Sequence, residues 1–90
     1  MREVVRAAAF KRDSKKLLRQ GKDLTALGNA ILILARNLAI PQQYQDHPLK
    51  GNWRGRREMH IAPDWLLIYH IENDTVYLDR TGSHAELLKR

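Results

Sequence analysis

The chain contains no cysteine, which excludes disulfide bonds and thiolate metal sites. It also lacks any apolar run long enough to cross a bilayer, and residues 1–16 lack the sustained apolar segment of a signal peptide. These absences predict a cytoplasmic protein with no membrane partner.

Length and hydrophobic content limit the kind of site that the chain can build. Ninety residues, 43% of them hydrophobic, predict one domain over residues 1–90, and a domain of this size buries only about 60–65% of its unfolded surface. We find no repeat, linker or low-complexity segment. Any site is therefore expected in a shallow groove on the face or along the edge of a sheet.

Acidic residues are also scarce, because ten Asp and Glu stand against sixteen Lys and Arg, a net charge of +6. The cations concentrate in segments 11–22 and 50–57, which carry six and four of them. Basic surface favours polyanions, because each neutralised phosphate releases condensed counterions. The alternatives are a solvated basic face and an acidic protein partner, since net charge bears on partners and not on the fold.

The first half of the chain predicts a short strand at Glu3–Arg6 and then two helices. Residues 7–20 have the pattern of an amphipathic helix, and Gly21 suits its end. Asp23 can cap a second helix, which Pro41 ends. The apolar face of that second helix has spacings of three and four residues and comprises Leu24, Leu27, Ile31, Leu34 and Leu38.

The second half of the chain predicts strands that follow a loop at residues 41–52. The three expected strands are residues 53–61, 65–72 and 75–80. A turn at 73–74 joins the last two strands, and a short helix capped by Ser83 follows at 84–90. Helices first and strands later indicate an α+β domain, an antiparallel meander with the helical hairpin packed on one face.

Three of the four histidines fall at strand ends or in the loop before the strands. With one carboxylate they form the candidate catalytic set His47, His60, Asp64 and His84. In an antiparallel meander the end of one strand lies beside the start of the next, so we expect His60 close to Asp64. The strand order does not follow from the sequence, so the place of His84 stays open. The candidate phosphate ligands are Lys50, Arg54, Arg56 and Arg80.

Such a set suits RNA cleavage by the RNA's own 2′-hydroxyl. The reaction needs a base for the hydroxyl proton, an acid for the leaving 5′ oxygen, and cations for the charge on the phosphoryl oxygens. Imidazole can take either proton role. Arginine presents a planar charged fork to phosphate, so Arg56 or Arg80 can stabilise the transition state. No metal or other cofactor is required.

The same residues have less specific explanations. Three histidines and an aspartate can bind a divalent cation, but Pro63 disfavours the helix of an H-E-x-x-H site, and the basic surroundings disfavour a cation. A histidine at a strand end is more often a hydrogen-bonded surface residue than a catalyst. His70, within the apolar strand, is interpreted as structural, and Trp53 and Trp65 can either stack on bases or join the core.

Two motifs carry a resemblance to a known family, the run DHPLKGNWRGRREMHIAPDWLLIYHI and the later DRTGSH. They resemble the YafQ branch of the RelE/ParE toxin superfamily, over nearly the whole chain. The resemblance implies a small curved sheet backed by helices, like that of microbial ribonucleases. It also implies a bacterial type II toxin that enters the A site of the 70S ribosome, cuts mRNA there, and is held inactive by a cognate antitoxin.

The resemblance implies roles for individual residues. The functional histidines and aspartate of the family correspond to His47, His60, Asp64 and His84, and Trp65 and Arg80 match positions tied to activity or substrate contact. We favour His84 for proton transfer, with Asp64 or His60 as its counterpart and Arg80 on the phosphate. Glu58 replaces an aspartate of the family and Leu88 an aromatic residue, which bears on substrate preference more than on chemistry.

Two other functions stay open at this point. A ParE-like member with the same fold would inhibit a topoisomerase by binding and would cleave nothing. A basic RNA- or ribosome-binding module would have no activity at all. A binding inhibitor needs no proton-transfer groups, so the histidine and aspartate set favours the endoribonuclease.

Overall fold

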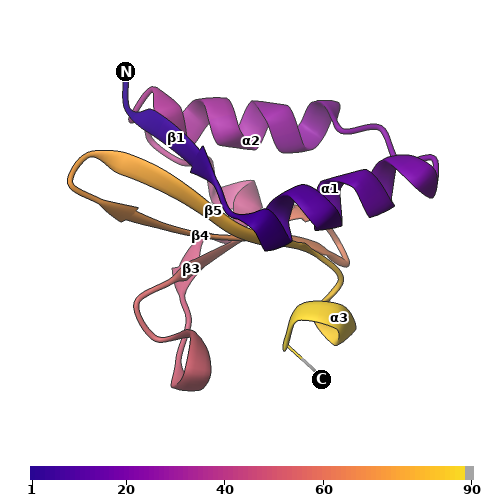
Figure 1. Ribbon diagram of the computed structural model, residues 1–90. Coiled ribbons are helices and arrows are strands. Elements are labelled where there is room, and N and C mark those ends of the chain that lie inside the picture. The colour runs from indigo at the N-terminus through magenta and orange to yellow at the C-terminus, as the bar shows by residue number, and fades with distance from the viewer. Residues whose placement is uncertain (89–90) are drawn as a thin grey trace.

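A computed structural model describes residues 1–88 as a five-stranded sheet with helices on both sides (Figure 1). The strands are β1 Glu3–Arg6, β2 His47–Pro48, β3 Arg57–Ala62, β4 Trp65–Glu72 and β5 Thr75–Gly82, in the order β1-β5-β4-β3-β2. The helices are α1 Ala8–Arg19, α2 Thr25–Ala35 and α3 His84–Leu88, with 3-10 turns η1 Gln42–Tyr44 and η2 Gly51–Trp53. β1 is parallel to β5, and the other pairs are antiparallel. The predicted α+β fold is confirmed.

Both predicted N-terminal helices form, but the second ends before Pro41. The Asp23 carboxylate accepts the backbone N–H of Thr25 at 2.9 Å, as the capping prediction requires. α2 stops because Asn37 takes a left-handed conformation, with φ 54°, and the N–H of Leu38 donates to the carbonyl of Ile33 at 3.0 Å. This is a Schellman ending. The residue spacing predicts Leu38 on the core face of the helix, but Leu38 lies beyond the helix end and is 54% exposed.

The first long strand starts later than the expected range 53–61. Trp53 belongs to the 3-10 turn η2, and β3 begins only at Arg57. Gly55 has φ +91°, and the N–H of Arg56 donates to the carbonyl of Trp53 at 3.0 Å, so the backbone turns here instead of extending. Trp53 thus lies outside the strand expected at 53–61. Its ring packs on the side of the sheet away from α1 and α2.

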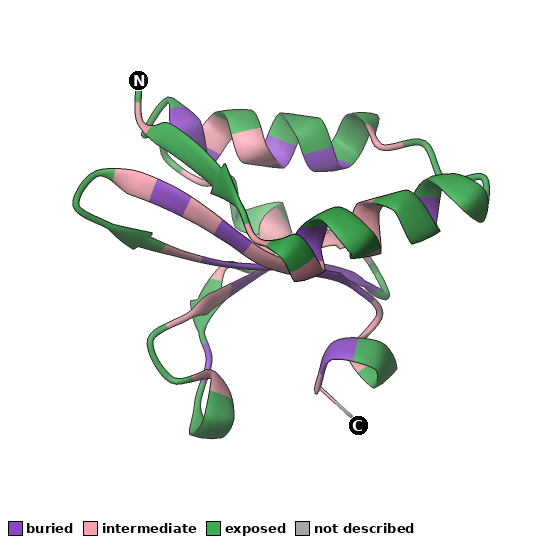
Figure 2. Cartoon of the chain, in the orientation of Figure 1, coloured by how far each residue is buried: buried purple, intermediate pink, exposed green. Residues whose placement is uncertain are grey.

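The sheet buries apolar side chains on both faces, and Figure 2 shows the buried positions along β4 and β5. The larger cluster lies under α1 and α2 and includes Leu67 and Tyr69. The smaller one, on the opposite face, comprises Leu49, Leu66, Ile68 and Leu87, with Trp53 and Leu88 packed against it. Full burial of such a side chain contributes roughly 1.5–3 kcal/mol. α3 and the loop of η2 are thus attached to the sheet face that the long helices leave free (Figure 1).

α3 is fixed at its first turn. The hydroxyl of Ser83 accepts the N–H of Glu86 at 3.2 Å, and the Glu86 carboxylate accepts the N–H of Ser83 at 3.2 Å, a capping box that confirms the predicted cap. Glu86 also pairs with Lys16 of α1. The last two residues of the predicted helix, 89–90, lie outside the described residues. No helix within residues 1–88 is long and apolar enough to cross a membrane.

Candidate active site

The strand order decides which histidines meet. β4 lies between β3 and β5, and Leu66 pairs with His60 on one side and with Gly82 on the other. The end of β3 and the end of β5 therefore lie at the same end of the sheet, one strand apart. His84 follows Gly82 by two residues, so α3 begins beside His60. The sequence left this position open.

Three imidazole rings form a row on the sheet face opposite α1 and α2. The ring centroids of His47 and His60 are 5.9 Å apart, and those of His60 and His84 are 5.5 Å apart. β2, β3 and the start of α3 supply one ring each. We call His47, His60 and His84 the histidine row.

Asp64 holds one end of the histidine row. Its Oδ1 accepts the Nδ1–H of His84 at 2.9 Å and the backbone N–H of His84 at 3.2 Å. These two hydrogen bonds hold the pKa of the Asp64 carboxyl below its ordinary value. Because Nδ1 of His84 carries the proton in this contact, Nε2 is the basic nitrogen of the neutral ring.

Glu58 holds the other end. His47 donates Nδ1–H to the carbonyl of Gln45 at 2.7 Å, and its Nε2 lies 2.7 Å from Oε2 of Glu58. A carbonyl only accepts, so the second ring nitrogen either donates to an ionised Glu58 or accepts from a protonated one. In both forms one proton lies between His47 and Glu58, and both nitrogens of His47 are occupied.

Two buried polar atoms at the histidine row lack a hydrogen-bond partner within residues 1–88, namely Nδ1 of His60 and Oε1 of the neighbouring Glu58. Unpartnered buried atoms of this kind are costly unless a ligand, ion or water completes them. His47, Glu58 and His60 each offer a ligand atom, and these atoms lie within 4.8 Å of one another. Two imidazoles and a carboxylate are also a donor set that divalent metals accept. This trio is the part of the site that can hold a cation.

An open groove of about 690 Å³ runs beside the row, between the loop of η2 and α3. Its lining includes His47, Lys50, Arg80 and Glu86. Arg80 is clamped by Asp13 of α1, through Nε to Oδ2 at 2.7 Å and Nη2 to Oδ1 at 3.1 Å. The paired carboxylate raises the pKa of Arg80 further, so its charge is permanent. The groove is thus lined by the cations Lys50 and Arg80, together with the His47 imidazole and the Glu86 carboxylate.

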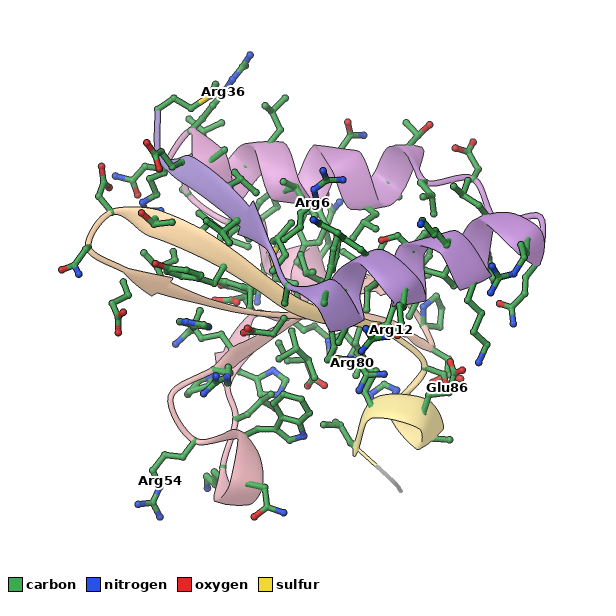
Figure 3. All side chains as sticks on the ribbon, viewed as in Figure 1. Arg6, Arg12, Arg36, Arg54, Arg80 and Glu86 are labelled. Carbon is green, nitrogen blue, oxygen red and sulfur yellow. The ribbon has the colours of Figure 1, made fainter. Side chains whose placement is uncertain are left out.

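The remaining predicted substrate ligands are not gathered at the row. Figure 3 shows Arg54 at the tip of the η2 loop, pointing away from Arg80. Arg56 lies 3.6 Å from Asp79 of β5. Trp65 is only 8% exposed, packs in the helix-side cluster, and donates its indole N–H to the hydroxyl of Thr81 at 2.9 Å. The predicted place of Trp65 on a substrate surface is wrong, because its ring is part of the core.

Two carboxylates that hold the site, Glu58 and Asp13, are not among the candidate site residues of the sequence. Glu58 shares a strand face with His60, and this spacing of two residues was a usable signal. Asp13 gives no signal, because it is 67 residues away from Arg80 along the chain. His70 lies on the same face as the histidine row, not beside the long helices, and hydrogen bonds Asp79.

In a comparison with protein families, the family model described as the bacterial toxin of type II toxin–antitoxin system, YafQ, matches residues 2–89. The chain belongs to the YafQ family. It is 37% identical to the mRNA interferase toxin YafQ of Escherichia coli K12 over 87 residues, which are 96% of this chain and 95% of that toxin. The YafQ family membership expected from the motifs is therefore confirmed.

Solved structures of similar chains share the fold. A copper-bound mutant toxin from Helicobacter pylori has a TM-score of 0.92 at 41% identity, covering 97% of this chain and 99% of that one. The E. coli DinJ–YafQ complex contains a chain with a TM-score of 0.89 at 36% identity, covering 97% and 98%. Of these two structures, the Helicobacter pylori toxin therefore carries copper and the E. coli chain a bound second protein.

Proposed function

We propose that this toxin is a ribosome-dependent endoribonuclease that cuts mRNA in the A site by metal-independent acid–base chemistry. The observation that carries the proposal is the histidine row, three imidazoles at 5.9 and 5.5 Å beside a cationic groove. Imidazoles in this number and at this spacing supply both a base and an acid within the span of one phosphodiester. The mRNA interferase activity named for the E. coli relative supports the same reaction.

His84 is the proposed general base. Asp64 keeps the proton of the neutral ring on Nδ1, so Nε2 is available to remove the proton of the 2′-hydroxyl. The 2′ oxygen then attacks phosphorus. As His84 becomes an imidazolium, the Asp64 carboxylate stabilises the new charge, which is the role of the aspartate in histidine–aspartate pairs generally.

His60 is the proposed general acid. The bond from phosphorus to the 5′ oxygen breaks, and the protonated ring of His60 gives that oxygen its proton. The products are a 2′,3′-cyclic phosphate and a 5′-hydroxyl end, so protons and charge balance over the step. Asp64 has no proton to donate near neutral pH, because hydrogen bonds from His84 lower its pKa and keep it ionised.

Cations stabilise the charge that develops on the phosphoryl oxygens. Arg80 is held by Asp13, lies in the groove beside the row and is 32% exposed at its side chain, so it is the proposed main phosphate ligand. Lys50 lines the same groove. His47, with both nitrogens occupied, is assigned electrostatic stabilisation instead of proton transfer.

The proposed partners are the 70S ribosome with mRNA and a cognate antitoxin. The net charge of +6 favours rRNA and mRNA as polyanions. The same charge favours an acidic partner protein that neutralises it, and the DinJ–YafQ complex of E. coli is a precedent for a bound antitoxin in the family.

Mapping of mRNA 5′ ends after induction in bacteria, with and without translation, tests the ribosome dependence. We expect in-frame cuts on translated messages alone. In a reconstituted translation reaction, His84→Gln should lower the cleavage rate by about two to four orders of magnitude, the usual contribution of acid–base catalysis. A message with a single 2′-deoxy nucleotide at the cut site should bind and stay intact.

Asp64→Asn and Asp23→Asn form a matched pair of variants. Both aspartates accept a backbone N–H from an exposed position, but Asp23 lies at α2, outside the site. The first should lose most of the cleavage and the second should keep it. Cleavage of the 2′-deoxy message would rule out the mechanism. Topoisomerase inhibition without any mRNA cleavage would support the ParE-like alternative instead.

A further inference from the structure

A second cluster of side chains lies on the same sheet face as the histidine row. The rings of His70 and Tyr77 are stacked, with centroids 4.7 Å apart and planes 6° from parallel. Nδ1 of His70 is 2.8 Å from Oδ2 of Asp79, and Nε of Arg56 is 3.6 Å from the same oxygen. Asp79 thus connects an aromatic pair to a guanidinium. None of these four residues belongs to the proposed reaction centre.

The strand register places this cluster further along the strands than the row. Leu66 pairs with His60, and His70 lies four residues further along β4, which is about 13 Å. Residues four apart in a strand share a face. His70 pairs with Tyr77, and a bulge between Ile68 and Tyr69 leaves Asp79 outside the ladder. A bulge of this kind redirects a side chain, and here that of Asp79 reaches His70.

The face is partly open to solvent at this point. The apolar cluster beneath α3 and the η2 loop ends at Ile68, so neither element covers the next row of side chains. His70 keeps 22% of its side chain exposed and Arg56 keeps 41%. A ring pair with a fixed cation beside it, on an open sheet face, is the arrangement that single-stranded nucleic acid uses for stacking and phosphate contact.

We propose that His70, Tyr77 and Arg56 form a second RNA subsite, where a base stacks on the ring pair and a phosphate contacts the guanidinium. The proposal rests on the endoribonuclease function, and it adds a contact about 13 Å along the strand from the level of His60. Asp79 is a positioning residue in this scheme. It holds the ring of His70 and orients Arg56 toward the strand.

Binding of uncleavable single-stranded RNA to the full-length toxin tests the subsite. Two oligonucleotides carry a 2′-deoxy nucleotide at the cut position; one spans the histidine row alone, and the other extends past it by more than the distance to His70. By fluorescence anisotropy, Tyr77→Ala should weaken the longer RNA by about fivefold, equivalent to roughly 1 kcal/mol of stacking. The affinity of Tyr77→Ala for the shorter RNA should equal that of the wild type. Tyr77→Phe, which keeps an aromatic ring, should bind the longer RNA as tightly as the wild type does.

Arg56→Gln provides a second variant whose exposed side chain can change with little risk to folding. For the longer RNA only, the slope of the logarithm of the binding constant against the logarithm of salt concentration should become shallower by about one, the value for one lost phosphate contact. Arg36→Gln is the control for net charge, because Arg36 is exposed at the end of α2, on the far side of the sheet in Figure 3. It should affect both RNAs equally and weakly.

The outcomes separate this subsite from the proposed function. If the wild type cleaves mRNA but Tyr77→Ala and Arg56→Gln bind the longer RNA as tightly as the wild type does, the subsite is refuted and the endoribonuclease function stands. Equal losses for the two RNA lengths would also refute it, since they indicate a structural role for the cluster. If the wild type binds neither RNA and cleaves no mRNA, both proposals fail.

Discussion

The clamp between Asp13 and Arg80 offers a test of how the fold positions the phosphate ligand. Asp13 accepts three hydrogen bonds, from Nε and Nη2 of Arg80 and from the backbone N–H of Thr81 at 3.1 Å. Asp13→Asn keeps the shape of the side chain and removes its charge. The amide also presents an N–H₂ group where one of these donors points, so at least one hydrogen bond is lost.

The expected loss of stability follows from these contacts. A hydrogen bond to a charged group contributes about 1.5–3 kcal/mol, and a buried donor left without a partner costs about 1–3 kcal/mol. Arg80 is 32% exposed at its side chain, so water replaces part of what it loses. We expect the free energy of unfolding to fall by about 2 kcal/mol. For a domain of this size that lowers the Tm by about 8–16 °C.

Thermal unfolding followed by circular dichroism, together with cleavage kinetics on programmed ribosomes, measures both consequences. Asp74→Asn is the matched control, because Asp74 pairs with Arg2 but is 80% exposed at its side chain, where an ion pair contributes at most about 1 kcal/mol. At temperatures below the unfolding transition, we expect kcat/KM of Asp13→Asn to be about tenfold lower than that of the wild type, because the guanidinium of Arg80 is less firmly held.

Two results would contradict this reasoning. A lower Tm with unchanged kcat/KM would mean that Asp13 stabilises the fold without positioning Arg80. A higher kcat/KM would mean that Asp13 competes with the RNA phosphate for the guanidinium.

Three further predictions concern the metal, the core and the pH dependence. Cleavage should survive metal chelation under conditions that leave ribosomes intact, and its loss there would favour a metal at the row. Trp65→Phe should lower the free energy of unfolding by about 1–2 kcal/mol, because Thr81 loses its indole donor, and should leave kcat unchanged in the same cleavage assay. The pKa of Asp64 is lower in the folded state than in the unfolded state. The stability that Asp64 contributes is therefore complete above the ordinary pKa of 3.8, and it is lost as the pH falls through the folded-state pKa. The stabilities of the wild type and Asp64→Asn, measured by unfolding at a series of pH values, should differ above pH 3.8 and converge below the folded-state pKa.

The local pattern of the sequence predicted most of the elements, since helix and strand periodicity and cap residues act over a few positions. The capping box of Ser83 and Glu86 and the cap by Asp23 are examples. The errors arose where a backbone conformation with positive φ overrode a continuing pattern. Asn37 ended α2 before Leu38, and Gly55 delayed β3 until Arg57.

The candidate catalytic set shows the same division. Residue type and strand ends indicated His47, His60, Asp64 and His84. The structure places the three rings in one row, and the Asp64 carboxylate accepts its hydrogen bonds from His84. Trp65 was assigned to the substrate, yet its ring joins the core, because alternation along a strand does not say which face the helices cover. Whether the four residues carry out the reaction stays a prediction.

The sequence by itself determined the family, the α+β class and the residue types of the site, because each of these depends on the spacing of nearby residues and on short motifs. Only the tertiary structure decided that β4 lies between the ends of β3 and β5, which closes the histidine row. It alone joined Asp13 to Arg80 and Arg56 to Asp79. Contacts between segments so far apart depend on strand order, register and a bulge, and no short stretch of sequence contains that information.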